Sequence, residues 1–340
     1  MIKNKVCEKK TLNIGISILR SLLCYWVLIV HLSMIKQKHL KYVCRHFHVP
    51  TFFMLSFYFF NPILRNKNEI KLKLRFQRLL YPYVSWSLII WIFQNTLTIL
   101  KLLGKNKKLL SLKDLYIQIL IGAHYYEVFW FQFNLLFLSL LFIIISYIAK
   151  KNLLYFLEFL SIISLYLHLS CIYHNYFKNF KLTIQKSIGC LNEILPLTVI
   201  GCVYGHLNFL STINNLNWFM NCIWLCLIYL IFEYNIFISY SGVLYPNIIL
   251  NVFASTLLFL FFGSLKLNKY PKIAFILKYL TSYTGGIYYI HEIFHRYLYF
   301  IFSIKNPTYF STFIIYIICY FVCYLGHKIF KNNNLKYLFL

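Results

Sequence analysis

Three uncharged windows of 20 residues or more are the first candidates for membrane-spanning helices in this sequence. They cover residues 79–100, 128–149 and 213–232. An α-helix needs about 20 apolar residues to cross the hydrocarbon core of a bilayer, where the backbone must satisfy its own hydrogen bonds. The sequence therefore predicts membrane-spanning helices at these three places.

Weaker or interrupted apolar windows fill most of the remaining chain. They lie at residues 12–34, 44–62, 153–174, 187–207, 243–263, 279–303 and 307–327. Of 340 residues 60% are hydrophobic and 12% charged, a composition that excludes both a soluble globular domain and a disordered chain. We expect an all-α, polytopic helical bundle with about ten transmembrane helices. The connections are too short for a soluble domain, so residues 1–340 form a single membrane-embedded domain.

The charge balance fits a membrane protein better than a nucleic-acid-binding protein. The chain carries 34 Lys and Arg against 8 Asp and Glu, and the basic residues form short runs between apolar stretches. Such runs are typical of loops that face anionic lipid headgroups. Lysines at positions 3, 5, 9 and 10 precede a first helix without a small-residue cleavage site. This predicts an uncleaved first helix, a multi-pass protein of the plasma (inner) membrane and, with ten helices, two cytoplasmic termini.

Two ionisable residues fall inside the first predicted helix. Arg20 and His31 are 11 residues apart, so they share one helical face about 16 Å apart along the axis. An arginine can grip an anion and a histidine can take a proton near neutral pH. Intramembrane ionisable residues are functional candidates by default. The alternative is that both side chains reach out to the headgroups on opposite sides of the membrane.

Further polar motifs occur at the edges of the predicted helices. Arg75 and Arg78, at spacing i, i+3, share a helical face suited to a polyphosphate, although simple anchoring at the membrane surface is an alternative. The segment His46 to Tyr58 carries histidines into the second helix.

The order and spacing of these motifs resemble acyltransferase family 3, a family of multi-spanning sugar O-acyltransferases. The resemblance rests on Arg20 and His31, FHVPTFFMLSFYFF, Arg75-x-x-Arg78 before RLLYPYVSW, VFWFQFNLL around Trp130, and SYTGGIYYIH ending at His291. It covers most of the chain. It departs at Phe57, where the family often has glycine between serine and tyrosine.

This resemblance implies transfer of an acyl group, usually acetyl, from cytoplasmic acyl-CoA to a hydroxyl of an envelope sugar or lipid-linked glycan. A base must take the hydroxyl proton, and His31 is the first candidate. The roles implied for the other residues are catalysis by Arg20 and His291, CoA binding by Arg75 and Arg78, and substrate contact by His48, Ser56, Tyr58 and Trp130. Acyl-CoA is a donor substrate here, and no permanently bound cofactor, metal or nucleic acid is expected.

Two other functions remain open from the sequence. A transporter or flippase of a lipid-linked glycan would share the many helices and the polar face, without needing a CoA clamp. His291-Glu-Ile-Phe-His295 matches the H-E-x-x-H pattern of zinc proteases, but no third ligand motif accompanies it. Pairing of Glu292 with Arg296 at i, i+4 explains the glutamate without a metal. Glu158 and Glu193 receive no role.

Overall fold

The computed structural model describes most of the chain in detail. The described residues are 13–31, 38–100, 108–122, 124–174, 183–210, 220, 223–228, 230–231, 247–265, 270–301 and 309–339. The helices in this part of the chain are α1 (Ile14–His31), α2 (Lys38–Arg65), α3 (Glu69–Ile99), α4 (Leu112–Ile121), α5 (Trp130–Ala149), α6 (Leu153–His174), α7 (Thr183–His206), α10 (Asn247–Ser264), α11 (Pro271–Leu280), α12 (Thr284–Ile301) and α13 (Tyr309–Ile329). Short 3-10 turns η1 (Glu127–Phe129), η2 (Lys150–Asn152) and η4 (Asn334–Phe339) complete them, and the described residues contain no strand.

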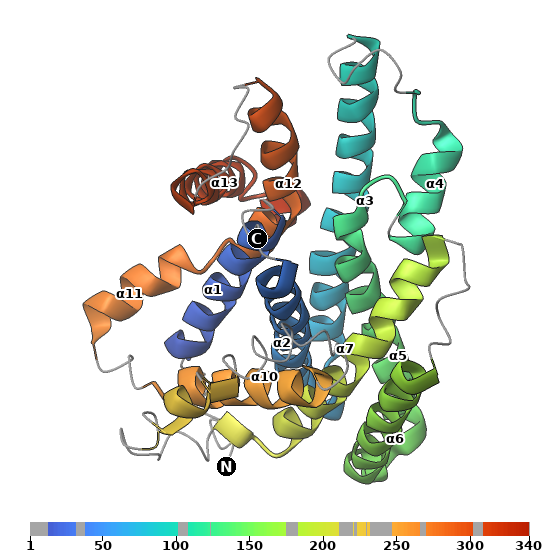
Figure 1. Cartoon of the computed structure of the whole chain (residues 1–340), viewed down its shortest axis with the longest axis vertical. Coiled ribbons are helices and arrows are strands. Elements are labelled where there is room, and N and C mark those ends of the chain that lie inside the picture. Colours follow the sequence, from blue (N-terminus) through green and yellow to red (C-terminus); the bar gives the residue numbers. More distant parts are fainter. Residues whose placement is uncertain are drawn as a thin grey trace, which may run out of the picture.

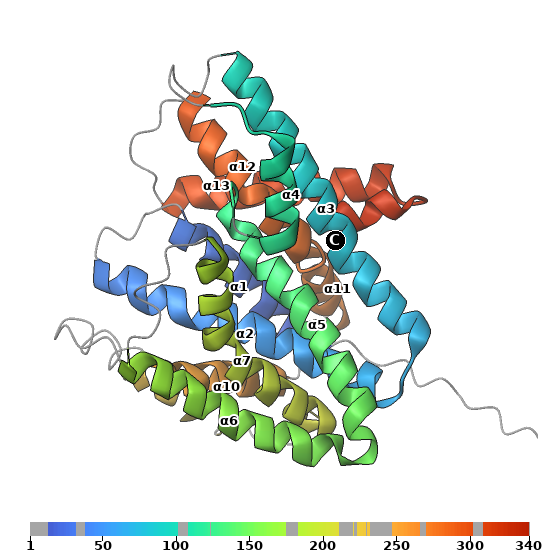
Figure 2. The same cartoon turned by 90° about the vertical axis from the view of Figure 1, so that its right-hand side faces the viewer.

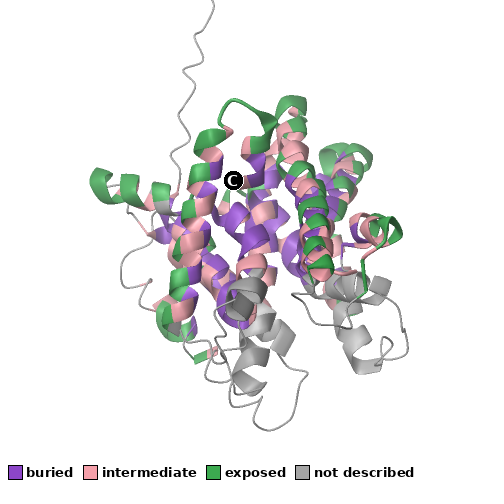
Figure 3. Ribbon diagram, turned by 90° about the horizontal axis from the view of Figure 1, so that it is seen from above, coloured by how far each residue is buried: buried purple, intermediate pink, exposed green. Residues whose placement is uncertain are grey.

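Helix α2 runs through the middle of the bundle, with α1, α7, α10 and α3 beside it (Figure 1). Figure 2 shows α3 as a long rod along one side and α6 along the bottom. Buried residues concentrate where these helices meet, and exposed residues lie on the outer faces (Figure 3). The outer faces still carry large apolar side chains such as Ile70, Ile148 and Phe310, as expected of helices that contact lipid.

Two glycines bring α7 unusually close to α2. A Cβ at Gly201 would lie 2.2 Å from the carbonyl oxygen of Met54, and one at Gly205 would lie 2.4 Å from that of Tyr58. The two glycines are four positions apart, with three residues between them, which is the small-xxx-small spacing that lets membrane helices pack backbone to backbone. The α2–α7 contact therefore depends on the absence of side chains at these two positions.

In the described residues the structure confirms the all-α class, and it supports membrane insertion. Among the described residues, three segments are long and apolar enough to cross a bilayer: Ile14–His31, Trp130–Tyr166 and Phe310–Ile329. The second comprises α5, η2 and the first part of α6, and the positive φ of 47° at Lys150 turns the chain between the two helices. Shorter apolar helices run over Ile194–His206 and Val252–Ser264. The count of ten spanning helices stays a prediction.

Several predicted windows differ from the helices observed. Window 79–100 belongs to a helix that begins ten residues earlier, at Glu69, where Asn68 caps it by accepting from the backbone N–H of Lys71. This helix is not among the three segments above, because its serine, amide and aromatic residues lower its hydropathy. Window 279–303 is interrupted by a turn at residues 281–283, which separates α11 from α12. Most of window 213–232 lies outside the described residues.

Candidate active site

The helices α1 and α12 meet through their polar residues. Nη2 of Arg20 on α1 donates to Oγ1 of Thr284 on α12, at 3.3 Å. Further along the same contact, the imidazole rings of His31 and His291 lie with their centroids 5.3 Å apart and tilted by 57°. The earlier residue of α1 contacts the earlier residue of α12, and the later residue contacts the later one. The two helices therefore run in the same direction. Arg20, His31 and His291, which the sequence predicts as catalytic from the two ends of the chain, thus face one interface.

The two histidines differ in their surroundings. His291 is buried, at 1% exposure, whereas His31 is half-buried at the last residue of α1. Nδ1 of His291 lies 2.6 Å from the carbonyl oxygen of Tyr288 and 3.3 Å from that of Ile287. Because a carbonyl only accepts, Nδ1 must carry the hydrogen, and in the neutral ring Nε2 holds the lone pair. The helix therefore fixes both the orientation and the tautomer of His291, while His31 keeps access to the exterior of the bundle.

The segment before α5 forms hydrogen bonds with α12 close to His291. Tyr288 Oη donates to the carbonyl of Val128 at 2.9 Å, and Tyr126 Oη to that of Tyr289 at 3.4 Å. The ring of Phe131 lies 4.8 Å from that of Tyr288, centroid to centroid. These contacts hold the α12 turn that carries His291 against η1 and the start of α5.

A second polar group surrounds Arg75. Its Nε and Nη2 donate to Ser139 Oγ on α5, at 3.2 and 3.1 Å, and Nη2 also donates to Ser56 Oγ on α2, at 3.0 Å. The guanidinium lies 4.0 Å from the centre of the Phe60 ring and 5.4 Å from that of Phe57. In the described part of the chain no carboxylate forms an ion pair with it. The three helices α2, α3 and α5 thus hold an arginine that contacts two serine hydroxyls and two aromatic faces.

The other predicted site residues are spread around these two groups. Arg78 is exposed, so it does not share the enclosed position of Arg75 despite the i, i+3 spacing. His48 is buried on α2, and Trp130 is half-buried at the start of α5. Tyr58 is buried, and its hydroxyl accepts from the backbone N–H of Leu210 rather than facing the Arg75 group.

Sequence reasoning did not identify Thr284 or Ser139 as site residues. Thr284 stands within the SYTGG motif, which was a usable signal, whereas Ser139 is one serine within an apolar helix and carried none. Phe57, the departure from the family pattern, packs fully buried against Phe60 and Phe142 and supplies one aromatic face to Arg75.

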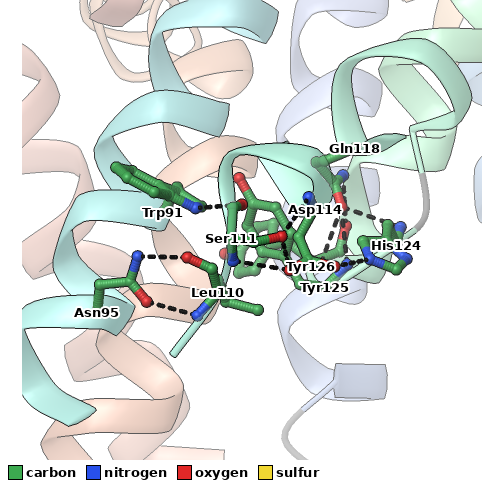
Figure 4. Close-up of polar contacts among 9 residues, drawn as sticks. All are labelled: Trp91, Asn95, Leu110, Ser111, Asp114, Gln118, His124, Tyr125 and Tyr126. Atoms are coloured by element: carbon green, nitrogen blue, oxygen red, sulfur yellow. Dashed lines mark hydrogen bonds and ion pairs between the residues drawn. The ribbon is translucent and has the colours of Figure 1, made fainter. Parts of the chain in front are cut away.

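A polar turn between α4 and α5 positions the residues that support α12 (Figure 4). Gln118 is fully buried, and its Oε1 accepts from the backbone N–H groups of His124, Tyr125 and Tyr126 at 2.9 to 3.1 Å. Its Nε2 donates to the carbonyl of Tyr126. One side chain therefore satisfies four backbone groups of a non-helical segment, including both polar groups of Tyr126.

Asp114 ties the same turn to α4. Its carboxylate lies 2.8 Å from Nε2 of His124 and accepts from the backbone N–H of Ser111 at the start of α4. The bonds from His124, and then from Ser111, hold the pKa of Asp114 at about 2, below the usual value of about 3.9.

We expect this pair to make stability pH-dependent at acid pH. The carboxyl pKa is lower when folded, so Asp114 stabilises the fold fully above about pH 4 and ceases to do so as the pH falls through about 2. The thermal midpoint of the wild type should therefore fall more steeply over this range than that of Asp114→Asn. Glu69→Gln, which removes an exposed carboxylate at the start of α3, is the control. Parallel curves for wild type and Asp114→Asn would contradict the prediction.

Among the described residues no three His, Cys, Asp or Glu side chains gather as a metal site. The side chains of Glu292, His295 and Arg296, as well as Glu193 and His46, lie outside the described residues. Glu158 is exposed on α6.

Comparison with known proteins gives a family match. A family model described as "Acyltransferase domain", the acyltransferase family 3 domain, matches residues 13–328. No curated protein and no solved structure matches the chain significantly. The matched range includes every residue discussed above as a candidate for the site.

Proposed function

The chain belongs to acyltransferase family 3 and is a membrane acyltransferase, and on this premise we propose that it transfers an acetyl group from cytoplasmic acetyl-CoA to a hydroxyl of a cell-envelope sugar or lipid-linked glycan. The proposed setting is the plasma (inner) membrane, with both termini in the cytoplasm. The observation that carries the proposal is the contact of His31 and Arg20 with His291 and Thr284 across the α1–α12 interface.

The arrangement suits attack of a hydroxyl on a thioester. His31, the more accessible imidazole, takes the proton of the acceptor hydroxyl as its oxygen bonds to the acetyl carbonyl carbon. The C–S bond then breaks, and the CoA sulfur leaves with the electron pair and receives the proton. Arg20 stabilises the negative charge that develops on the carbonyl oxygen. His291, whose tautomer its own helix fixes, orients His31.

Arg75 and Arg78 supply positive charge for the phosphates of CoA. In the described part of the chain the bonds of Arg75 use Nε and Nη2, and the serines hold its guanidinium in one orientation. Arg78, one turn further along the same helix, is exposed and meets a ligand arriving from outside the bundle. A charged nucleotide group would thus be held by one fixed and one mobile guanidinium.

Removing Arg78 separates this function from a transporter or flippase. With Arg78→Ala we expect the KM for acetyl-CoA to rise about tenfold, equivalent to about 1.4 kcal/mol of lost charge-assisted hydrogen bonding. Lys73→Ala removes an equal charge from an exposed position about 140° around the same helix, and should change KM less than about twofold. A flippase that does not bind CoA would tolerate both changes.

The measurement is transfer of radiolabelled acetyl from acetyl-CoA in membranes that contain the protein, with label followed into glycan and lipid fractions. The fraction that gains label identifies the acceptor class. Incorporation no greater than in membranes without the protein would overturn acetyl transfer from acetyl-CoA.

A further inference from the structure

The C-terminal segment of the chain packs against the beginning of the helix that carries His291. This segment, η4 (Asn334–Phe339), contacts α3, α12 and α13. It lies beyond residue 328, where the family match ends. The properties of the family therefore do not account for it.

A hydrogen bond and two aromatic contacts hold η4 in place. Nε1 of Trp86 on α3 donates to the carbonyl of Leu338 at 3.1 Å, and the Trp86 ring meets the Phe339 ring edge-on at 6.3 Å. Phe339 also stacks on Phe330 at an interplanar angle of 3°. Tyr337 and Leu338 are both buried. These contacts make η4 part of the packed core rather than a loose tail.

Two glycines provide the space that the segment occupies. A Cβ on Gly286 of α12 would lie 2.8 Å from the carbonyl carbon and oxygen of Phe339. A Cβ on Gly326 of α13 would lie 2.5 to 2.7 Å from three ring atoms of Phe339, which are its nearest neighbours. The backbone of the tail thus lies directly on the first turn of α12.

This first turn is also where α12 meets Arg20. Gly286 follows Thr284, which accepts from Arg20, by two residues, and precedes His291 by five residues, or about 7.5 Å of helix. Because a helix moves as a rigid unit over this distance, displacing the turn at Gly286 displaces both contacts with α1. A misplacement of about 1 Å at a reacting group lowers rates by up to about 10²-fold.

We propose that the C-terminal segment Asn334–Phe339 is a positioning element of the acyl-transfer site, which fixes the first turn of α12 and so keeps Thr284 against Arg20 and His291 against His31. This inference rests on the proposed function. It assigns a role to residues outside the matched family domain. The proposed role is indirect, because η4 acts by holding α12 and not by touching the reacting groups.

A double-mutant cycle between Phe339 and Gly326 tests the proposal. Phe339→Ala and Gly326→Ala should each lower kcat for acetyl transfer on the order of tenfold. KM for acetyl-CoA should stay within about twofold, because Arg75 and Arg78 lie on α3 two or more helical turns before Trp86, the α3 residue that binds the segment. In the double variant, the methyl group added at position 326 has no ring to displace, so kcat should be no lower than in Phe339→Ala alone. Ile329→Ala, which shortens a 72% exposed apolar side chain at the end of α13 and outside η4, is the control and should match the wild type.

A role limited to general stability would reduce the amount of folded protein and leave kcat per folded molecule unchanged. That result would overturn the proposal. It would also be overturned if the fold-reduction of kcat in the double variant equalled the product of the fold-reductions in the two single variants. Trp86→Phe keeps the ring contact and removes only the bond to Leu338, so its kcat should lie between those of wild type and Phe339→Ala.

A second measurement does not depend on activity. Cys323 is fully buried, and its Sγ borders the same space at Gly286 as Phe339. Alkylation of Cys323 by a membrane-permeant maleimide, followed by peptide mass spectrometry, should be about tenfold faster in Phe339→Ala than in the wild type. Equal rates would overturn the docking of the tail. Absence of acetyl transfer in the wild type would instead overturn the proposed function.

Discussion

Replacing His31 with alanine should lower kcat for acetyl transfer by about 10² to 10⁴, the range typical of a general base, with KM for acetyl-CoA little changed. Among the histidines of the described site, His31 combines contact with His291 and access from outside the bundle. The measurement is the initial rate of label transfer from acetyl-CoA, normalised to folded protein.

His206→Ala is the matched control for this change. His206 also ends a helix, α7, and is half-buried, but it belongs to neither polar group of the site. It should retain wild-type transfer. If His31→Ala transfers acetyl as fast as wild type, His31 is not the base and the mechanism fails.

Replacing Gly201 with alanine should strongly destabilise the fold. Intrinsic helix propensity alone favours alanine over glycine by about 1 kcal/mol. The new Cβ, however, would lie 2.2 Å from the Met54 carbonyl oxygen, a backbone atom that cannot move without shifting α2. Overpacking of this kind costs about 3 kcal/mol, so the clash outweighs the propensity. We expect a lower melting temperature and a smaller monodisperse fraction in detergent.

Gly263→Ala on α10 provides the contrast, because it makes the same substitution against a yielding neighbour. Its Cβ would approach Cδ2 of Leu210, the far end of a flexible side chain, at 2.5 Å. This contact can relax, so the gain in propensity should offset most of the cost. Equal loss of stability in the two variants would show that close α2–α7 packing is not the cause.

The residues of the site illustrate how far local sequence information extends. Arg20 and His31 share a face because helical periodicity fixes their angular separation, so their alignment followed from spacing alone. The partner of each, Thr284 and His291, follows more than 250 residues later, and spacing holds no information on such contacts. Arg75 and Arg78 show where spacing misleads. The helical repeat places both on one face of α3, but α2 and α5 pack around Arg75 and leave Arg78 exposed.

The sequence alone determined the helical class, the membrane setting and the family, because the length of apolar runs, the helical repeat and short motifs are local properties of the chain. Only the tertiary structure decided which residues meet: the pairing of α1 with α12, the hydroxyl groups around Arg75, the Gln118 turn and the seat of Phe339 between Gly286 and Gly326. Those contacts join residues far apart in sequence. They depend on how whole helices pack, which no local pattern encodes.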